Sequence, residues 1–201
     1  MPINETERAE RMRQSFTGRS LTASQLDEAV ALAGIMHREI QKSGSFRDKL
    51  TDYAHSFARS ERFDALKGEE IVRDAFKASY GETMNEMRER LMEKETAFAD
   101  NATEKESLGY ARKILEHMSS NAELPFYRAY DRAALHMAAR HGITESGAKS
   151  FMKEAFAKSE GRELYDAAKE IEAGRESRAP ASPTKSHRRS AQGKRRPGPA
   201  R

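Results

Sequence analysis

The sequence has no cysteine and no tryptophan among its 201 residues. Without cysteine the chain can form no disulfide, thiolate zinc site or iron–sulfur cluster, and it has no cysteine nucleophile. Proline is scarce as well, with six residues in the whole chain. A cysteine-free composition suits a reducing compartment. We therefore expect the protein to be cytoplasmic when it is made.

Long apolar runs are also missing. No segment approaches the roughly 20 consecutive apolar residues that a membrane-spanning helix requires. The segment from Met1 to Arg11 is charged on every turn and lacks the apolar stretch of a signal peptide. The sequence therefore predicts a soluble protein without a membrane span.

The common catalytic and cofactor-binding motifs do not occur. The chain has no Gly-x-Gly-x-x-Gly or Gly-x-x-x-x-Gly-Lys-Ser/Thr loop, no His-Glu-x-x-His pair and no Gly-x-Ser-x-Gly turn. His136 and His141 are five residues apart, so they do not share a helix face as two metal ligands would. These absences predict a protein that is not an enzyme and that uses neither a metal nor another cofactor.

The residues that are abundant favour helices. Charged residues make up 34% of the chain and hydrophobic residues 37%, and Ala, Glu, Lys and Arg are good helix formers. Apolar residues recur at helical spacing through most of the chain, as at Phe46, Leu50, Tyr53, Ala54 and Phe57. The predicted fold class is an all-α helical bundle.

Several local signals mark helix ends. Thr22–Gln25 and Thr103–Glu106 both have the form of a capping box, which begins a helix. Gly44 and Gly81 follow apolar helical stretches and are expected to end them. The aromatic cluster Phe126–Tyr130 follows a proline, and we expect it to fix the start of another helix to the core.

The chain contains an internal similarity at an offset of 80 residues. At this offset Ile71–Gly81 aligns with Phe151–Gly161, and both segments contain Ala-Phe-x-x-Ser-x-Gly. The register holds without a gap from Phe46–Leu91 onto Phe126–Ile171. Two amphipathic helices can match by their period alone, but a fixed offset across three helices and their loops favours two tandem copies of a roughly 46-residue helical unit.

Each such copy is too small to bury its apolar faces alone, so the copies should pack on each other or on a second chain as a homo-oligomer. The charged segment Leu91–Glu106 joins them, with Phe98 as its main apolar anchor. The predicted parts are an N-terminal segment (1–20), a first helical unit (21–98), a second helical unit (99–173) and a disordered basic tail (174–201).

Charge is divided unevenly between these parts. Residues 174–201 contain nine Lys or Arg and one acid, a net charge of +8, so the rest of the chain must carry −4 to give the total of +4. The only apolar side chains of the tail are alanine and proline, which bury too little surface to offset the entropy of ordering. We therefore expect an anionic partner to meet the tail first.

The basic residues near the end of the chain are Arg188, Arg189, Lys194, Arg195, Arg196 and Arg201. In these residues the tail resembles the C-termini of substrates of bacterial type IV secretion and conjugation systems, which commonly end in an unstructured, arginine-rich segment. The resemblance covers about 28 residues. It implies that an export receptor recognises the tail and that the protein leaves the cytoplasm through a type IV secretion system.

Two other interpretations of the tail remain open. Its cations could contact DNA or RNA phosphates with little sequence readout and a strong dependence on salt. No helix of the body is basic enough to resemble a recognition helix, so such a protein would be a DNA/RNA-binding accessory protein. Alternatively, the tail could serve only as a solubilising extension.

Overall fold

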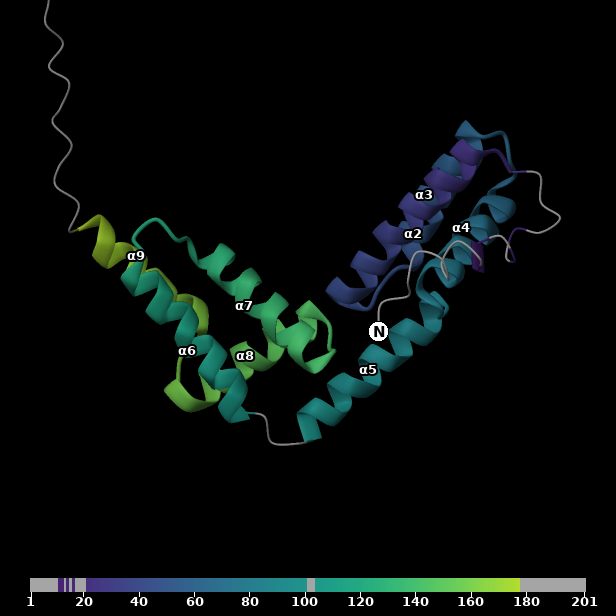
Figure 1. Cartoon of the computed structure of the whole chain (residues 1–201). Helices are drawn as coiled ribbons and strands as arrows, with labels where there is room; N and C mark the ends of the chain where they lie inside the picture. The colour runs from purple at the N-terminus through teal and green to yellow at the C-terminus, as the bar shows by residue number, and fades with distance from the viewer. Residues whose placement is uncertain (1–10, 13, 15, 17–20, 101–103, 178–201) are drawn as a thin grey trace, which may run out of the picture.

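The computed structural model describes residues 11, 12, 14, 16, 21–100 and 104–177. Within these residues every regular element is an α-helix (Figure 1). The helices are α2 (Ala23–Ser43), α3 (Arg47–Ser60), α4 (Ala65–Tyr80), α5 (Met84–Asp100), α6 (Glu104–Ser120), α7 (Phe126–His141), α8 (Glu145–Glu160) and α9 (Leu164–Glu176). The all-α prediction is confirmed.

The eight described helices form two groups with separate apolar cores. Helices α2–α5 make the first helical group, and its core includes Met36, Phe57 and Phe76. Helices α6–α9 make the second helical group, with Met137 and Phe156 in its core. Figure 1 shows the groups as two arms that are linked at the end of α5.

The sequence signals for helix ends are confirmed where the structure describes them. At the start of α2, Thr22 N donates to Gln25 Oε1 (2.9 Å) and Gln25 N donates to Thr22 Oγ1 (3.2 Å), which completes the predicted capping box. Gly44 and Gly81 end α2 and α4 with φ of 69° and 78°, a conformation that a Cβ would strain. The second predicted capping residue, Thr103, lies outside the described residues.

Helix order repeats between the two groups. Helices α3, α4 and α5 begin at residues 47, 65 and 84, while α7, α8 and α9 begin at 126, 145 and 164. The same pairs pack: α4 lies against α2 and α3, and α8 lies against α6 and α7. This pattern includes four helices per group, more than the roughly 46-residue unit read from the sequence. A shared helix order does not establish common ancestry, so the tandem duplication stays a prediction.

The first helix of each group follows a different offset. Buried side chains of α2 recur in α6 after 78 residues, at Ala29, Ala33, Met36 and Ile40 in α2 and at Ser107, Ala111, Ile114 and Met118 in α6. The connection before α7 (121–125) is two residues longer than the connection before α3 (44–46), which accounts for the change of offset. His37 and His117 coincide at an offset of 80, but only His37 is partly buried.

The last helix continues past the predicted start of the tail. Helix α9 extends to Glu176, so the predicted boundary at Gly174 lies too early. Arg175 explains the extra length, since its Nη1 donates to the carbonyl oxygens of Ala122 (3.1 Å) and Leu124 (3.2 Å). These contacts fix the end of α9 to the connection between α6 and α7.

Replacing Phe156 with alanine tests the second core. The Phe156 side chain is 2% exposed, and its removal leaves a cavity that should lower the free energy of unfolding by about 3–5 kcal/mol. Chemical denaturation followed by far-UV circular dichroism measures this loss. Leu66→Ala is the control, because Leu66 is 79% exposed and its loss should change stability by less than about 0.5 kcal/mol. Equal effects of the two changes would contradict the described core.

Candidate functional site at the tail and the junction of the helical groups

The predicted partner-binding residues all lie in the tail. Arg188, Arg189, Lys194, Arg195, Arg196 and Arg201 are outside the described residues. Their role stays a prediction that rests on charge and composition. The described residues instead define how the two helical groups meet, which determines the surface that the body presents to a partner.

Helix α5 contributes to both cores. Met84, Met87 and Leu91 from its first half lie in the core of the first helical group. Phe98, near its end, lies in the core of the second group, where its ring contacts His141 (4.7 Å between centroids) and Phe151 (5.0 Å). The sequence predicted that Phe98 anchors the join, and its 6% exposure agrees with that prediction.

A buried polar contact fixes α5 to the start of α8. Thr144 is the N-cap of α8, is 2% exposed, and accepts a hydrogen bond at Oγ1 from Gly147 N (2.9 Å). Glu95 Oε1 of α5 accepts hydrogen bonds from Thr144 N (2.8 Å) and from the Thr144 hydroxyl. A carboxylate in this position also interacts favourably with the positive end of the helix dipole.

Gly147 is needed for this contact. A Cβ at this position would lie 2.6 Å from Glu95 Oε1, closer than any ordinary contact. Sequence analysis missed the contact because Glu95 and Thr144 are 49 residues apart, although Thr144 and Gly147 resemble the start of a capped helix. The three residues together join the two groups at one point.

A shallow groove of about 200 Å³ lies beside this junction. It is bordered by His37 from α2, Arg90 from α5 and Leu135 from α7. The His37 ring stacks on Tyr80 with centroids 4.1 Å apart. Burial lowers the pKa of His37, Glu82 opposes this effect, and Arg90 adds to it. The volume is below the roughly 300–1,000 Å³ of small-molecule sites, so the groove alone defines no ligand pocket.

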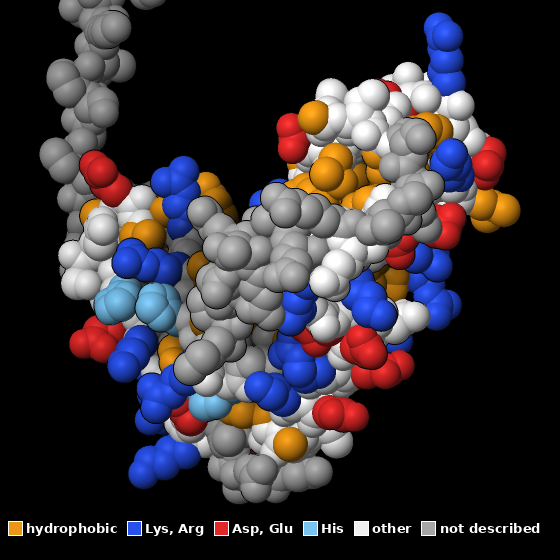
Figure 2. Space-filling model, turned by 45° about the vertical axis from the view of Figure 1, so that its right-hand side comes forward, with side chains coloured by type: hydrophobic (Ala, Val, Ile, Leu, Met, Phe, Trp, Pro, Cys, Tyr) orange, Lys and Arg blue, Asp and Glu red, His pale blue; other side chains and the backbone are white. Residues whose placement is uncertain are grey.

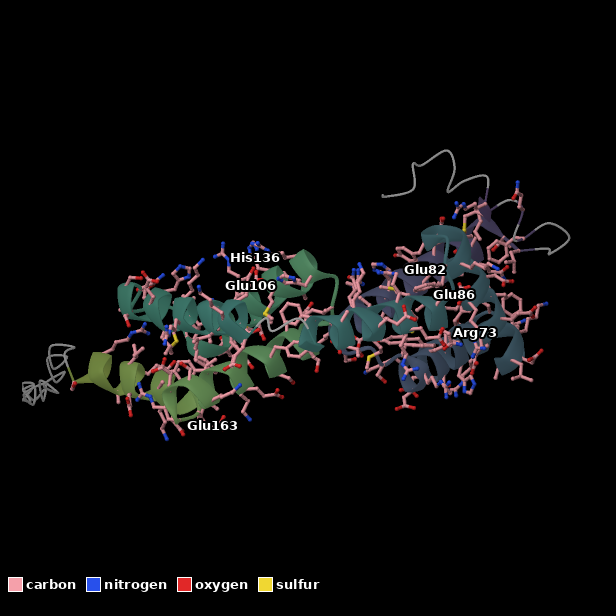
Figure 3. All side chains as sticks on the ribbon, turned by 90° about the horizontal axis from the view of Figure 1, so that it is seen from below. Arg73, Glu82, Glu86, Glu106, His136 and Glu163 are labelled. Carbon is pink, nitrogen blue, oxygen red and sulfur yellow. The ribbon has the colours of Figure 1, made fainter. Side chains whose placement is uncertain are left out.

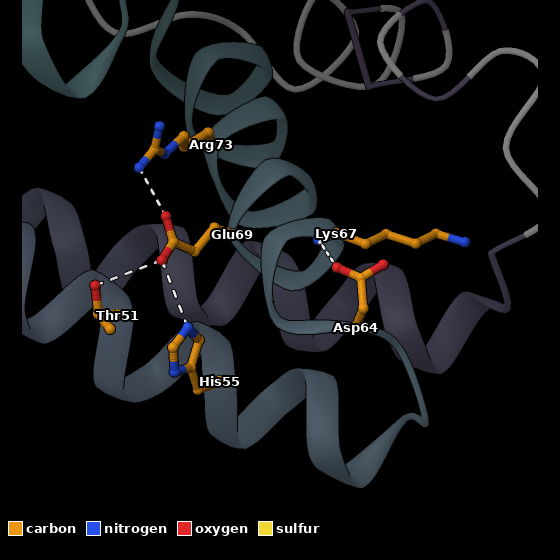
Figure 4. A network of polar contacts seen from close by, with 6 residues as sticks. All are labelled: Thr51, His55, Asp64, Lys67, Glu69 and Arg73. Carbon is orange, nitrogen blue, oxygen red and sulfur yellow. Dashed lines mark hydrogen bonds and ion pairs between the residues drawn. The ribbon is translucent and has the colours of Figure 1, made fainter.

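Polar clusters on the body connect neighbouring helices. Glu69 of α4 accepts a hydrogen bond from Arg73 Nη2 (2.8 Å) and one from Thr51 Oγ1 (3.4 Å), and it lies 3.7 Å from His55 Nε2 (Figure 4). A single carboxylate that accepts from a cation and a hydroxyl ties α3 to α4. It lacks the second carboxylate or activated nucleophile that catalysis would require.

A second cluster connects α6 to the end of α7. Glu106 lies 3.3 Å from Arg140 Nε and 3.2 Å from His141 Nε2. Figure 3 shows Glu106 in the second helical group, near His136, and far from Arg73 and Glu82 in the first. Across the residues that the structure describes, no three His, Asp or Glu side chains are grouped to hold a metal ion.

Comparisons with known proteins identify no relative. No protein-family model, no curated protein and no solved structure matches this chain. None of the described helices is long and apolar enough to cross a membrane. Function must therefore be argued from the chain itself.

Replacing Glu95 with alanine tests the junction. The change leaves the buried N–H and hydroxyl of Thr144 without their acceptor, which should lower the free energy of unfolding by about 1–3 kcal/mol. Urea denaturation measures the loss. Glu93→Ala removes an exposed carboxylate from the same helix and should cost less than about 0.5 kcal/mol. If the two variants were equally stable, Glu95 would not hold the groups together.

Proposed function

We propose that this chain is a non-enzymatic helical interaction protein whose basic tail directs it to an anionic partner, first of all the receptor of a type IV secretion or conjugation system. The observation that carries the proposal is the separation of charge. The tail (174–201) has a net charge of +8, whereas the rest of the chain has −4. An anionic receptor is attracted by the tail and not by the body.

The surface of the body supports this division of roles. Figure 2 shows Lys and Arg side chains interspersed with Asp and Glu over the visible face, so that face has no large area of a single sign. The last described residue of the body, Ser177, follows α9 at the end of the second helical group that is remote from the first (Figure 1). A receptor that binds beyond Ser177 can act without contacting the first group.

Nucleic acid is the second candidate partner, because the same cations match phosphate. Each phosphate that the tail neutralises releases counterions, so affinity for duplex DNA should fall with salt at a log–log slope near −0.9 per contact. Export and phosphate binding use the same residues, so the two functions must be separated by experiment.

The test replaces Arg188, Arg189, Lys194, Arg195 and Arg196 with glutamine in the full chain fused to a reporter. Transfer of the reporter through a type IV secretion system should stop, because the charge that the receptor recognises is gone. The matched control replaces five exposed lysines of the body, Lys42, Lys49, Lys105, Lys113 and Lys169, and should leave transfer unchanged.

DNA binding of the same proteins separates the two candidates. If export is the function, the unmodified protein should bind DNA only weakly at about 0.15 M salt. Tight binding that depends on the tail, together with no transfer of the reporter, would contradict the export proposal and favour nucleic acid. Truncation after Ser177 is preferred to truncation after Gly174, because it retains the contacts of Arg175.

A further inference from the structure

The first helical group contains a cavity of about 660 Å³, which lies within the usual range of small-molecule sites. It opens between the start of α3, the second half of α4 and the start of α5. Its apolar lining is Phe46, Leu50 and Met84, which are 6%, 2% and 4% exposed. These side chains belong to the core, so the cavity has an ordered apolar wall.

Basic side chains form much of the polar lining. Arg47 from α3 and Arg73 and Lys77 from α4 border the cavity, with Asp74 as the only acid among its lining residues. Among the described residues, Arg47 has no ion pair. Arg73 uses Nη2 to bind Glu69 and remains 59% exposed. The lining therefore carries an excess of positive charge.

The nearby Glu86 does not cancel this excess. Its Oε2 accepts a hydrogen bond from Thr83 N (2.6 Å), which is the main reason that the pKa of Glu86 is lowered. Lys77 lowers the same pKa to a smaller degree. The Glu86 carboxylate is thus engaged with the first turn of α5. Figure 3 shows Arg73 and Glu86 on the same group.

The second helical group provides an internal comparison, because the lining residues have counterparts 80 positions later. There Arg47 is replaced by Tyr127 and Lys77 by Ala157. Arg73 corresponds to Lys153, whose Nζ lies 3.6 Å from Glu163. Two of the three cations are absent in the second group, and the third is paired.

Aromatic side chains occupy the corresponding space in the second group. Tyr130 stands where the first group has Leu50, and its ring stacks on Phe126 with centroids 5.2 Å apart. Tyr165 stands where the first group has Asn85, and its ring packs edge-on against Phe126 at 5.7 Å. Tyr130 donates a hydrogen bond to the carbonyl oxygen of Lys149 (2.7 Å), and burial raises the pKa of Tyr130 to about 12.

The two groups thus differ in both volume and charge at this place. We propose that the cavity of the first helical group binds a small organic phosphate, with the phosphate at Arg47 and Lys77 and the organic part against Phe46, Leu50 and Met84. Guanidinium groups match phosphate oxygens in bidentate geometry, and an ammonium adds a point charge. The cavity is larger than a phosphate group, and its apolar wall suits the remainder of such a ligand. This site is independent of the tail.

The test titrates ¹⁵N-labelled full-length protein with adenosine 5′-monophosphate, adenosine and inorganic phosphate, and follows amide shifts by NMR. Adenosine 5′-monophosphate should shift amides at the start of α3, in the second half of α4 and at the start of α5. Inorganic phosphate should shift the same amides with lower affinity, and adenosine should shift none of them. Shifts in the tail are resolved from these, so phosphate binding by the tail is measured separately.

Variants assign the binding to the cavity. Arg47→Gln and Lys77→Gln should each weaken binding of adenosine 5′-monophosphate about tenfold or more, as expected for the loss of a charge-assisted hydrogen bond. Asn85→Tyr introduces the residue of the second group and should block the cavity. Lys153→Gln is the matched control and should leave the affinity unchanged. Amide spectra and thermal midpoints of all variants report whether the fold is kept.

Three results would overturn the proposal. The first is that adenosine 5′-monophosphate shifts only amides of the tail. The second is that adenosine binds at α3–α5 as tightly as its phosphate. The third is that Arg47→Gln and Lys77→Gln, while still folded, bind as the unmodified protein does. Any of them would mean that the excess charge at the cavity recognises no phosphate.

Discussion

Helix α5 has to satisfy two cores at once, and the placement of the two helical groups depends on this constraint. Its first half buries Met84, Met87 and Leu91 with α2–α4, while Phe98 is buried with α6–α9. Because a helix is a rigid connector, both sets of apolar contacts can form only in one relative arrangement. Glu95 adds polar specificity, since its carboxylate accepts from the backbone and the hydroxyl of Thr144 in the other group. Groups of this size bury limited apolar surface alone, and sharing a helix enlarges what each can bury.

Within this frame the two groups have similar helix order but different surfaces. At the start of α7 the second group is filled by stacked rings, with Phe126, Tyr130 and Tyr165 in contact. At the start of α3 the first group has an open, cation-lined cavity instead. The proposed roles therefore separate along the chain: ligand binding in the first group, packing in the second, and recognition by an anionic partner in the tail.

Local signals predicted the helices well, because caps and apolar spacing act within a few residues. The capping box at Thr22 and the left-handed glycine at Gly44 are examples, and Phe98 was recognised by its isolation in a charged segment. Long-range features were not predictable. The contact between Glu95 and Thr144 and the cavity arise only when distant segments meet. The extension of α9 to Glu176 depends on carbonyl groups about 50 residues earlier, which Arg175 binds. The tail residues named from the sequence lie outside the described part of the chain.

The central claim is that α5 couples the two groups into one cooperative unit. Native-state hydrogen exchange of the full chain, measured at increasing denaturant, tests it most directly. If α5 couples the groups, the most protected amides of α4 and α8 should exchange with the same opening free energy, and their denaturant dependences should merge into one global transition. Two separate transitions, with α8 opening while α4 remains protected or the reverse, would contradict the coupling.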